Sequence, residues 1–553
     1  MVDIADNSST LASLDMNAAG TAGSFSGQIE TLGDHDWIRF DIAVGGVWMF
    51  FAHFQNAGSG YGDSLLTFRD GSGTILNTYD DRTPGFNSTT PAIALSAGTY
   101  FLEIEDLGND NTGSYVISAM RDPATLQTGG VTTDDDSISA GQAGNFVADG
   151  GDDIIDLSAL GNDAMGEQGN DTLVGNSLAN RLFGGLGNDF ILGQGGDDTI
   201  FGDAGDDFIV GGFGNDELFG GAGNDRLQGE FDNDTLRGGA GDDLLEGGDG
   251  GDFLYGGPGS DRLEGGAGQD FLDSDGGDTV MVGGEDGDFY TVDSASDQVI
   301  ELPGDSGVDT VFATVSHTLA DNVEALIFVG LSSQALNGTG NGLANTITGH
   351  GGANVLDGGS AGSDGVIDTL AGLLGNDTYV LGSGNDIVTD TGGIDTITST
   401  KTRSLASYTG IENLKLLGSA NINGSGTSAA NVLTGNSGAN KLYGGAGKDT
   451  YTGGGGGDRF IFKTAADSKV GSARDVIKDF STSGTTERID LSAFAGTFAF
   501  RGTGPFTSAG KEVSYKFVGK NTLVKIDLDA DAGAEMEIML IGHKVLTAGD
   551  FYL

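Results

Sequence analysis

The stretch GGLGNDFILGQGGDDTIFGDAGDDFIV, from Gly184 to Val210, repeats one pattern three times. Each of its three nonapeptides begins with glycine and has aspartate at its sixth position and isoleucine at its eighth. The same period extends on both sides of this stretch, because residues 148–273 divide into fourteen consecutive nonapeptides without an insertion or a deletion. A short strand and a turn that alternate in this way, with one inward aliphatic side chain per strand, predict a β-solenoid.

The polar half of each nonapeptide has the composition of a cation site. Glycines at positions one, two and four allow backbone angles that are closed to other residues, so we expect the turn to fold its carbonyl oxygens around a small cavity. The sixth-position aspartate adds a carboxylate to that cavity. Oxygen ligands without histidine or cysteine favour a hard cation, and calcium fits better than magnesium or zinc.

The period that matters for a cation is expected to be eighteen residues. If one strand and one turn take nine residues, a full coil of a flattened solenoid takes eighteen, and successive turns alternate between its two edges. Ions are then expected between neighbouring aspartates of each edge. One edge stacks Asp189, Asp207, Asp225, Asp243 and Asp261, and the other stacks Asp198, Asp216, Asp234, Asp252 and Asp270.

These repeats resemble the RTX (repeats-in-toxin) calcium-binding parallel β-roll, whose pattern GGxGxDxUx is matched by GGFGNDELF and GGAGNDRLQ. In that family, turn carbonyls and the sixth-position aspartates of adjacent turns coordinate Ca²⁺. Carried over to this chain, the resemblance implies metal ligation by Asp153, Asp171, Gly185, Gly187, Asp189, Gly196, Asp198, Gly205, Asp207, Gly212, Gly214, Asp216, Gly221, Gly223, Asp225, Asp234, Gly239, Gly241, Asp243, Gly248, Gly250, Asp252, Gly257, Gly259, Asp261, Gly266, Gly268, Asp270, Asp288, Asp377, Asp386, Asp449 and Asp458.

Some turns depart from the pattern. Asn162 and Asn180 offer neutral oxygens at position six, so weaker or missing sites are expected there. The same expectation applies where the second or fourth glycine is replaced, which happens at Gln194, Asp203, Glu230 and Asp232.

The chain is expected to be all-β, with an N-terminal β-sandwich, calcium-bound parallel β-roll segments and a C-terminal β-rich secretion domain. Residues 1–122 alternate as antiparallel strands do. Phrases such as GDHDWIRFDI and LSAGTYFLEI in this segment resemble the bacterial pre-peptidase C-terminal domain, which implies a secreted accessory role. An RTX roll is expected over 148–291, a connecting β-segment over 292–339, a second, duplicated RTX roll over 340–465 and the end domain over 466–553.

The end domain resembles the C-terminal secretion domain of serralysin-type RTX proteins. Its terminus DFYL looks like the acidic-then-hydrophobic tail that type I exporters read, although a last strand docked in a sheet explains those residues equally well. Type I export from a Gram-negative bacterium would also account for an N-terminus that shows no signal peptide. The phrase DLDADAGAE, from Asp527 to Glu535, begins like an EF-hand loop, but Ala532 stands at the glycine position and Ile538 at the bidentate glutamate position, so a β-hairpin turn is expected.

Composition restricts the partners. The formal net charge is −56, which disfavours nucleic acid and anionic membranes and favours cations. No apolar run approaches the roughly 20 residues of a membrane span, and the absence of cysteine excludes disulfides and thiolate zinc sites. Residues 184–273 hold 21 Asp and Glu but only three Arg, so we expect this segment to fold only when cations are bound.

The sequence favours a non-enzymatic role. The five histidines have no zincin spacing, and neither a GxSxG elbow nor a phosphate-binding loop is present. The leading hypothesis is a secreted, extracellular or cell-surface calcium-binding protein, which type I machinery exports unfolded and extracellular calcium folds. It would act as a surface, matrix or adhesion component, by self-assembly or by binding a surface or polysaccharide ligand. The alternative is an extracellular hydrolase or polysaccharide-modifying enzyme with its site on a solenoid face, which a row of exposed aromatic side chains would favour.

Overall fold

A computed structural model of the chain is all-β and divides into two compact units, Met1–Val308 and Asp309–Leu553. It describes residues 146–148, 150–157, 163–304, 307–330, 334–359, 366–382, 385–483, 487–507 and 509–553, together with the backbone strands that precede them. The helices of this described part are three-residue 3-10 turns at Leu405–Ser407, Gly471–Ala473 and Ala548–Asp550, so none of them could cross a bilayer.

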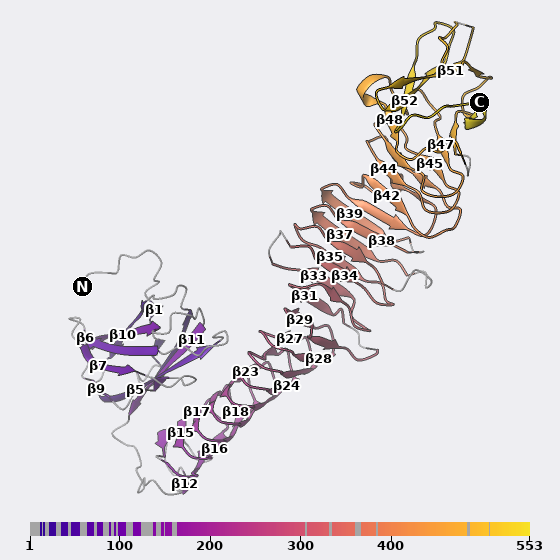
Figure 1. Ribbon diagram of the computed structural model, residues 1–553. Helices are drawn as coiled ribbons and strands as arrows, with labels where there is room; N and C mark the ends of the chain where they lie inside the picture. Colours follow the sequence, from indigo (N-terminus) through magenta and orange to yellow (C-terminus); the bar gives the residue numbers. More distant parts are fainter. Residues whose placement is uncertain are drawn as a thin grey trace. The chain divides into compact units, whose positions relative to one another are not determined.

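The first eleven strands form two sheets (Figure 1). One sheet has the order β1-β4-β10-β6-β7; the other has the order β2-β3-β11-β5-β8, and β9 also pairs with β5. The side chains of this segment lie outside the described residues. The strands are β1 Ala12–Ser13, β2 Asp15–Met16, β3 Ala22–Gln28, β4 His35–Ile42, β5 Gly46–Gln55, β6 Ser64–Asp70, β7 Ile75–Asp80, β8 Ser88–Thr89, β9 Ile93–Leu95, β10 Gly98–Asp106 and β11 Ser114–Asp122.

The rest of the first unit is a parallel solenoid, in which even-numbered strands form one sheet and odd-numbered strands the other (Figure 1). Each strand pairs in parallel with the strand eighteen residues later, as Ile191 does with Ile209. The even sheet comprises β12 Ser137–Ser139, β14 Ile154–Asp156, β16 Thr172–Asn176, β18 Phe190–Gly195, β20 Phe208–Phe213, β22 Arg226–Phe231, β24 Leu244–Asp249, β26 Arg262–Ala267, β28 Val280–Glu285 and β30 Gln298–Ile300. The odd sheet comprises β13 Asn145–Val147, β15 Asp163–Gln168, β17 Arg181–Leu186, β19 Thr199–Ala204, β21 Glu217–Ala222, β23 Thr235–Ala240, β25 Phe253–Tyr255, β27 Phe271–Asp273 and β29 Phe289–Val292.

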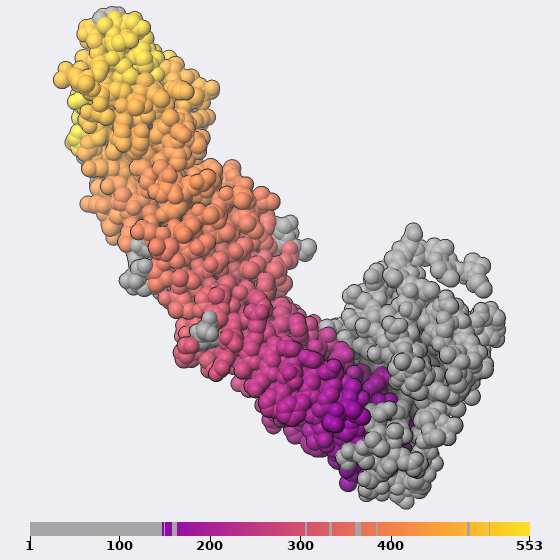
Figure 2. Space-filling model, turned by 180° about the vertical axis from the view of Figure 1, so that it is seen from behind, coloured from indigo at the N-terminus to yellow at the C-terminus, as the bar shows by residue number. Residues whose placement is uncertain are grey.

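The core is a column of eighth-position side chains. Strand geometry points successive side chains to opposite faces, so positions seven and nine point away from the side that position eight faces. At position nine, Met165, Phe183, Phe201 and Phe219 form a buried cluster of their own. From Ile155 to Leu272 every eighth-position side chain is fully buried, including Ala164, which stands where the other repeats have isoleucine or leucine. The expected inward aliphatic position is therefore confirmed, and the stacking of coils is visible as a steady progression of colour along the described surface of each unit (Figure 2).

The second unit continues the same construction. Strands within the expected connecting segment already pair in parallel with strands of the second roll, β33 with β35 and β34 with β36. One set of strands is β31 Thr310–Ala313, β33 Ala325–Phe328, β35 Thr346–Thr348, β37 Thr369–Leu374 and β39 Ile387–Gly392. A second is β32 His317–Thr318, β34 Asn337–Thr339, β36 Val355–Asp357, β38 Thr378–Leu381, β40 Thr396–Ser399, β42 Asn413–Leu416, β44 Val432–Thr434, β46 Thr450–Thr452 and β48 Asp475–Ile477. A third is β41 Arg403–Ser404, β43 Gly424–Ser425, β45 Lys441–Tyr443, β47 Arg459–Ile461 and β49 Arg488–Asp490.

The C-terminal strands close the second unit. An antiparallel meander of β51 Glu512–Val518, β52 Asn521–Asp527 and β53 Met536–Leu540 is joined to the roll, because β53 pairs in parallel with β48; the short β50, Ala499–Phe500, lies beside β51. The last strand, β54 Phe551–Tyr552, pairs with β49. Phe551 is buried, and the Tyr552 ring lies 4.0 Å from the Arg459 guanidinium carbon. In the folded chain the DFYL terminus is thus a docked strand.

Candidate metal centre

Each sixth-position carboxylate from Asp171 to Asp288 accepts one hydrogen bond from the backbone of the coil before it. The Asp207 Oδ1 atom accepts from the Asp189 backbone N–H at 2.8 Å, and on the other edge Asp216 Oδ1 accepts from Asp198 N–H at 2.7 Å. Such bonds, 2.7–2.9 Å long and spanning eighteen residues, confirm the two expected stacks. One stack runs through Asp153, Asp171, Asp189, Asp207, Asp225, Asp243 and Asp261, and the other through Asn180, Asp198, Asp216, Asp234, Asp252, Asp270 and Asp288.

The second carboxylate oxygen, Oδ2, is buried and accepts no hydrogen bond from the described residues at most of these positions. Burying a carboxylate oxygen without a partner is costly, and native proteins rarely do so unless an ion is involved. A series of such atoms in successive coils therefore indicates a bound cation. They belong to Asp171, Asp189, Asp198, Asp207, Asp216, Asp225, Asp234, Asp243, Asp252, Asp261 and Asp270.

Glycine at position one keeps the space beside this oxygen open. A Cβ atom at Gly202 would lie 2.3 Å from Asp207 Oδ2 and 2.6 Å from the carbonyl oxygen of Gly220, which is the same position one coil later. The same oxygen contacts recur at Gly193, where a Cβ would lie 2.3 Å from Asp198 Oδ2. A carboxylate oxygen and a peptide oxygen thus converge on one small space, and a methyl group would fill it.

The expectation that position one needs an unusual backbone angle is wrong. Among the described repeats, the first-position glycines have no φ in the left-handed region, and glycine is required there because of the missing side chain alone. Position one, which the sequence did not single out as a ligand position, supplies the carbonyl that lies next to the carboxylate oxygen.

Positions two and four do adopt left-handed angles, as expected of the glycines in the turn. Gly185 has φ 115° and Gly187 has φ 123°, and a Cβ at Gly187 would lie 1.8 Å from the carbonyl oxygen of the same position one coil earlier. Gly250 and Gly259 are approached as closely, at 1.7 Å, without a left-handed φ. The non-glycine replacements keep the left-handed angle, with φ 78° at Gln194, 73° at Asp203, 80° at Glu230 and 73° at Asp232, so the turn retains its shape at these departures.

A second ladder, at position five, was not anticipated. The Asn188 side-chain oxygen accepts from the Asp206 backbone N–H at 3.0 Å, and Asp206 Oδ1 in turn accepts from Asn224 N–H at 2.8 Å. It runs in the opposite sense to the sixth-position ladder, since each side chain bonds the next coil rather than the previous one. The signal that could have revealed it is the recurrence of Asn or Asp at position five.

Burial raises the pKa values of the sixth-position carboxyl groups. It raises the pKa of Asp207 to about 9, with the charges of Asp225 and Asp189 adding to the effect and the hydrogen bond from Asp189 opposing it. On the other edge, burial raises the pKa of Asp198 to about 8. Burial is the main cause, because it disfavours the charged form, and the neighbouring carboxylates add a smaller repulsion.

The donor set fits a calcium ion. All the groups that converge are oxygens, from carboxylates and peptide carbonyls, and oxygen-only sites suit hard divalent cations. A divalent cation would satisfy the buried Oδ2 atoms and offset the repulsion within each stack. The first-position glycine carbonyls and sixth-position aspartates are the groups placed to hold it.

The second unit repeats the ladder with fewer aspartates. Asp377, Asp449 and Asp458 have a buried Oδ2 that accepts no hydrogen bond from the described part of the chain, as has Asp395, which the sequence did not single out as a ligand. At Asp386 the Oδ1 contact with the Asp368 N–H is long, at 3.4 Å. The Tyr379 hydroxyl, at an eighth position, donates to Asp390 Oδ2 at 2.5 Å. Asp390 is thus a third carboxylate close to Asp377 and Asp395.

Asparagine at position six forms different contacts. Asn440 Oδ1 accepts from the backbone N–H of Asn436 at 2.9 Å within its own turn, and its Nδ2 group donates to the Ile422 carbonyl at 2.6 Å. Asn431 does the same with Thr427 at 2.7 Å and the Glu412 carbonyl at 3.0 Å. The amide therefore contacts a peptide oxygen of the preceding coil directly.

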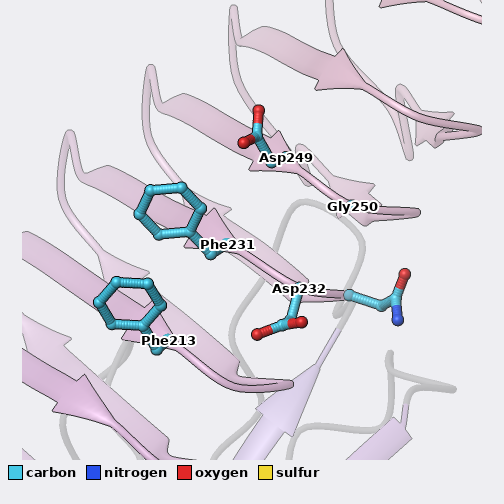
Figure 3. Close-up of a pocket in the computed structure, with 6 residues that line it drawn as sticks. Phe213, Phe231, Asp232, Asp249 and Gly250 are labelled. Carbon is cyan, nitrogen blue, oxygen red and sulfur yellow. The ribbon is translucent and has the colours of Figure 1, made fainter.

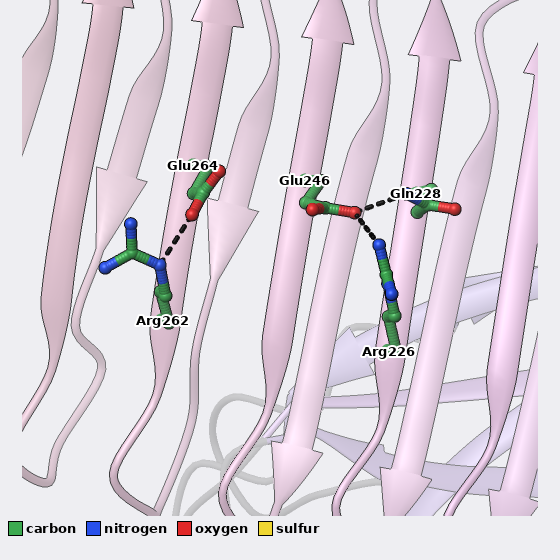
Figure 4. Close-up of polar contacts among 5 residues, drawn as sticks. All are labelled: Arg226, Gln228, Glu246, Arg262 and Glu264. Atoms are coloured by element: carbon green, nitrogen blue, oxygen red, sulfur yellow. Dashed lines mark hydrogen bonds and ion pairs between the residues drawn. The ribbon is translucent and has the colours of Figure 1, made fainter.

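The outer face of the even sheet carries ion pairs. On the even sheet, Arg226 lies 2.9 Å from Glu246, and Arg262 lies 2.5 Å from Glu264 (Figure 4). Ion pairs this exposed contribute about 0–1 kcal/mol. These pairs are too weak to offset the charge of the edges.

One edge carries an exposed aromatic pair. The rings of Phe213 and Phe231 stack 4.7 Å apart with an angle of 7° between their planes, beside a hollow of about 530 Å³ that Asp232 and Asp249 also line (Figure 3). The next coil places Asp249 at the equivalent position, so this pair spans two coils and does not extend into a row.

A sequence profile of the RTX calcium-binding nonapeptide repeat matches this chain in overlapping segments that run from residue 158 to 290, and again over 339–361, 367–388, 380–399 and 425–460. These segments are RTX calcium-binding repeats. The RTX repeats of this chain accordingly bind Ca²⁺, and they form the β-solenoid described above.

No curated protein sequence matches the chain. Similar solved structures include the Aeromonas hydrophila lysozyme inhibitor PliG, 7% identical over 20% of this chain and 95% of that one, with a TM-score of 0.15. A GH87 α-1,3-glucanase catalytic domain is 9% identical over 85% and 99% of the two chains, with a TM-score of 0.18. A thermostable GH87 α-1,3-glucanase from Streptomyces thermodiastaticus is 12% identical over 86% and 98%, with a TM-score of 0.16. Because the TM-scores are so low, these likenesses carry no conclusion.

Proposed function

We propose that this protein is a secreted calcium-binding RTX protein whose rolls fold when extracellular calcium fills the two edges. The proposed ligands are the sixth-position aspartates and the turn carbonyls around them. The observation that carries the proposal is the series of buried Oδ2 atoms, such as that of Asp207, which the described residues leave without a hydrogen bond. Each is matched by a first-position glycine that leaves room for an ion.

The energetics support folding that depends on calcium. Each nonapeptide from Ile155 to Leu272 buries one eighth-position side chain, which is little apolar burial for nine residues whose backbone must be ordered. Stacked carboxylates add repulsion to that deficit. Metal binding to the folded form alone contributes its binding free energy to folding, so calcium can decide which state is populated.

The proposed route is type I export of the unfolded chain. Low cytosolic calcium would leave the rolls unfolded, and extracellular calcium would fold them after export. In the folded chain Phe551 is buried and the Asp550 carboxylate accepts a hydrogen bond from the Thr547 N–H at 2.6 Å. An exporter that reads this tail would therefore have to bind it before the second unit closes. The proposed N-terminal sandwich over 1–122 and the secretion domain over 466–553 fit that route.

The proposed role is that of a surface, matrix or adhesion component. Its support is the presence of exposed charged side chains on the outer face of the even sheet, where Arg226 pairs with Glu246 and Arg262 with Glu264. Aromatic rings also meet across successive coils, at Phe213–Phe231, Phe190–Phe208 and Phe253–Phe271, and these short runs are the features that would favour the polysaccharide-modifying alternative. Light scattering across a calcium titration tests assembly, and a persistent monomer would contradict self-assembly as the mode of action.

Circular dichroism of the full chain tests calcium-dependent folding. Excess chelator should remove most of the β signal, millimolar calcium should restore it, and the same concentration of magnesium should restore much less, because magnesium keeps its water shell and demands octahedral geometry. An unchanged spectrum in chelator would refute the proposal that calcium supplies the folding free energy.

A further inference from the structure

An acidic loop outside the nonapeptide repeats joins β52 to β53. It is the phrase DLDADAGAE, and the antiparallel pairing of Ile526 with Met536 confirms the expected hairpin turn. The hairpin nevertheless brings four carboxylates together, with one oxygen of each lying within 4.8 Å of the others. They belong to Asp527, Asp529, Asp531 and Glu535.

The loop backbone fixes one oxygen of each carboxylate. Asp527 Oδ1 accepts from Asp529 N–H at 3.1 Å, and Asp529 Oδ1 accepts from Asp531 N–H at 2.9 Å. Asp531 Oδ1 accepts from Gly533 N–H at 2.6 Å, and Glu535 Oε2 accepts from Leu528 N–H at 2.6 Å. These turns occupy one oxygen per side chain, so a second oxygen of each remains for another partner.

Asp527 shows that the cluster is built around something positive. Its side chain is fully buried, yet its Oδ2 atom accepts no hydrogen bond from any described residue. None of the four carboxylates forms an ion pair with a described lysine or arginine. Burial, together with the charges of Glu535, Asp529 and Asp531, raises the pKa of Asp527. A cation would stabilise a fully buried, unsatisfied carboxylate oxygen that lies beside three other carboxylates.

We propose that this hairpin is a calcium site of its own, separate from the sites of the RTX repeats. Four carboxylates at positions i, i+2, i+4 and i+8 form a hard, oxygen-only donor set that can follow the shape of a large cation. Ala532 makes the sharp turn without glycine, with φ 64°, and Glu535 supplies the fourth carboxylate, whereas Ile538 lies in β53. Because β53 pairs with β48, the ion would brace the sheet on which the second roll ends.

The test is a double substitution that deletes charge and keeps the turn. In Asp529→Asn with Asp531→Asn, the side-chain oxygens can still accept the backbone hydrogen bonds, but two anionic ligands are lost. The matched control is Asp197→Asn with Asp206→Asn, two exposed position-five residues that also accept backbone N–H groups through Oδ1. Hydrogen exchange of the full-length chain, read by mass spectrometry, separates peptides of the hairpin from peptides of the rolls.

Calcium should protect the hairpin in the wild type and in the control. In the double variant its amides should exchange about tenfold faster at free calcium about ten times the dissociation constant, while roll peptides stay protected and native mass spectrometry counts one ion fewer. In chelator the hairpin amides of the variant should exchange no faster than those of the wild type, because fewer carboxylates repel one another in the variant. Equal exchange of wild type and variant in calcium would overturn the proposal, as would equal protection by magnesium. If the rolls do not need calcium to fold, their peptides will be protected equally in calcium and in chelator, whatever the hairpin does. The two proposals are therefore tested separately.

Discussion

The substitution Asp207→Asn separates the two roles of a sixth-position carboxylate, which are to accept a backbone hydrogen bond and to bind a cation. In the folded roll Asp207 Oδ1 accepts the Asp189 N–H, and an asparagine oxygen can take over that bond. Oδ2, which accepts no hydrogen bond from the described residues, would become an amide nitrogen. The substitution therefore keeps the ladder and removes one anionic ligand from the middle of a seven-membered stack.

The expected loss follows from binding linkage. At free calcium about one hundred times the dissociation constant, one ion contributes about 2.7 kcal/mol to folding. Asp207 lies between Asp189 and Asp225 in the stack, so a loss that reaches ions on both sides would cost about 5 kcal/mol. In chelator the sign should change, since burial raises the pKa of Asp207 to about 9 and the metal-free fold disfavours its charge at neutral pH.

Urea unfolding of the full chain in saturating calcium and in chelator measures both effects. The control is Asp206→Asn, which makes the same change of charge one residue away, at an exposed position where Asn188 and Asn224 stand in the neighbouring coils of the same edge. Its effect should stay within about 0.5 kcal/mol. If Asp207→Asn and Asp206→Asn lose the same stability in calcium, the sixth-position carboxylate is not a metal ligand.

Three further outcomes are expected. In chelator, acidification from about pH 8 to about pH 5 should increase the β signal. The buried carboxyl groups have pKa values of about 6 to 9 in the fold, against about 3.9 in the unfolded chain, so the folded state loses stability as the pH rises between these values. A flat pH profile would contradict this expectation. Gly202→Ala should raise the calcium concentration needed for folding, as seen by circular dichroism, since its Cβ would lie 2.3 Å from Asp207 Oδ2; an unchanged midpoint would show that the space is not used. Gln194→Gly should stabilise the calcium-bound roll by about 1 kcal/mol in thermal unfolding, by relieving a left-handed φ of 78°, and a loss of stability would show that the side chain has another role.

The structural features that follow from the nine-residue repeat were predictable from the sequence. A strict repeat of nine fixed the inward position from Ile155 to Leu272, and the geometry of a two-sheet coil fixed the pairing of Asp189 with Asp207 rather than with Asp198. Both follow from side-chain alternation along a strand. The hairpin at Asp527 was predictable for a similar local reason, because the residues that an EF-hand needs at two positions are absent.

The features set by contact between coils were not predictable. Gly202 is required by the approach of an oxygen from Asp207 and another from Gly220, and a sequence does not show which oxygens meet there. The convergence of Asp527 with Glu535 likewise depends on how the hairpin turns at Ala532, a residue that rarely adopts a left-handed angle. The continuation of the solenoid through β31 to β34 depends on pairing with neighbouring strands, because the glycine pattern is missing from that segment.

Aspartate and asparagine at position six are satisfied in different ways. An aspartate has two acceptor oxygens, so after bonding the previous coil it needs a positive partner. An asparagine offers one acceptor and one donor, and at Asn431 and Asn440 the donor reaches a peptide carbonyl of the preceding coil. The backbone N–H of each of these asparagines donates to the aspartate of the next coil, Asn431 to Asp449 and Asn440 to Asp458. An asparagine at position six is thus satisfied by the neighbouring coils themselves, whereas an aspartate whose Oδ2 accepts no hydrogen bond from the described residues gains a partner when a cation is held between coils. Loss of one ion would therefore weaken the coils on both sides of it, as expected of a solenoid in which each repeat is stabilised by its neighbours.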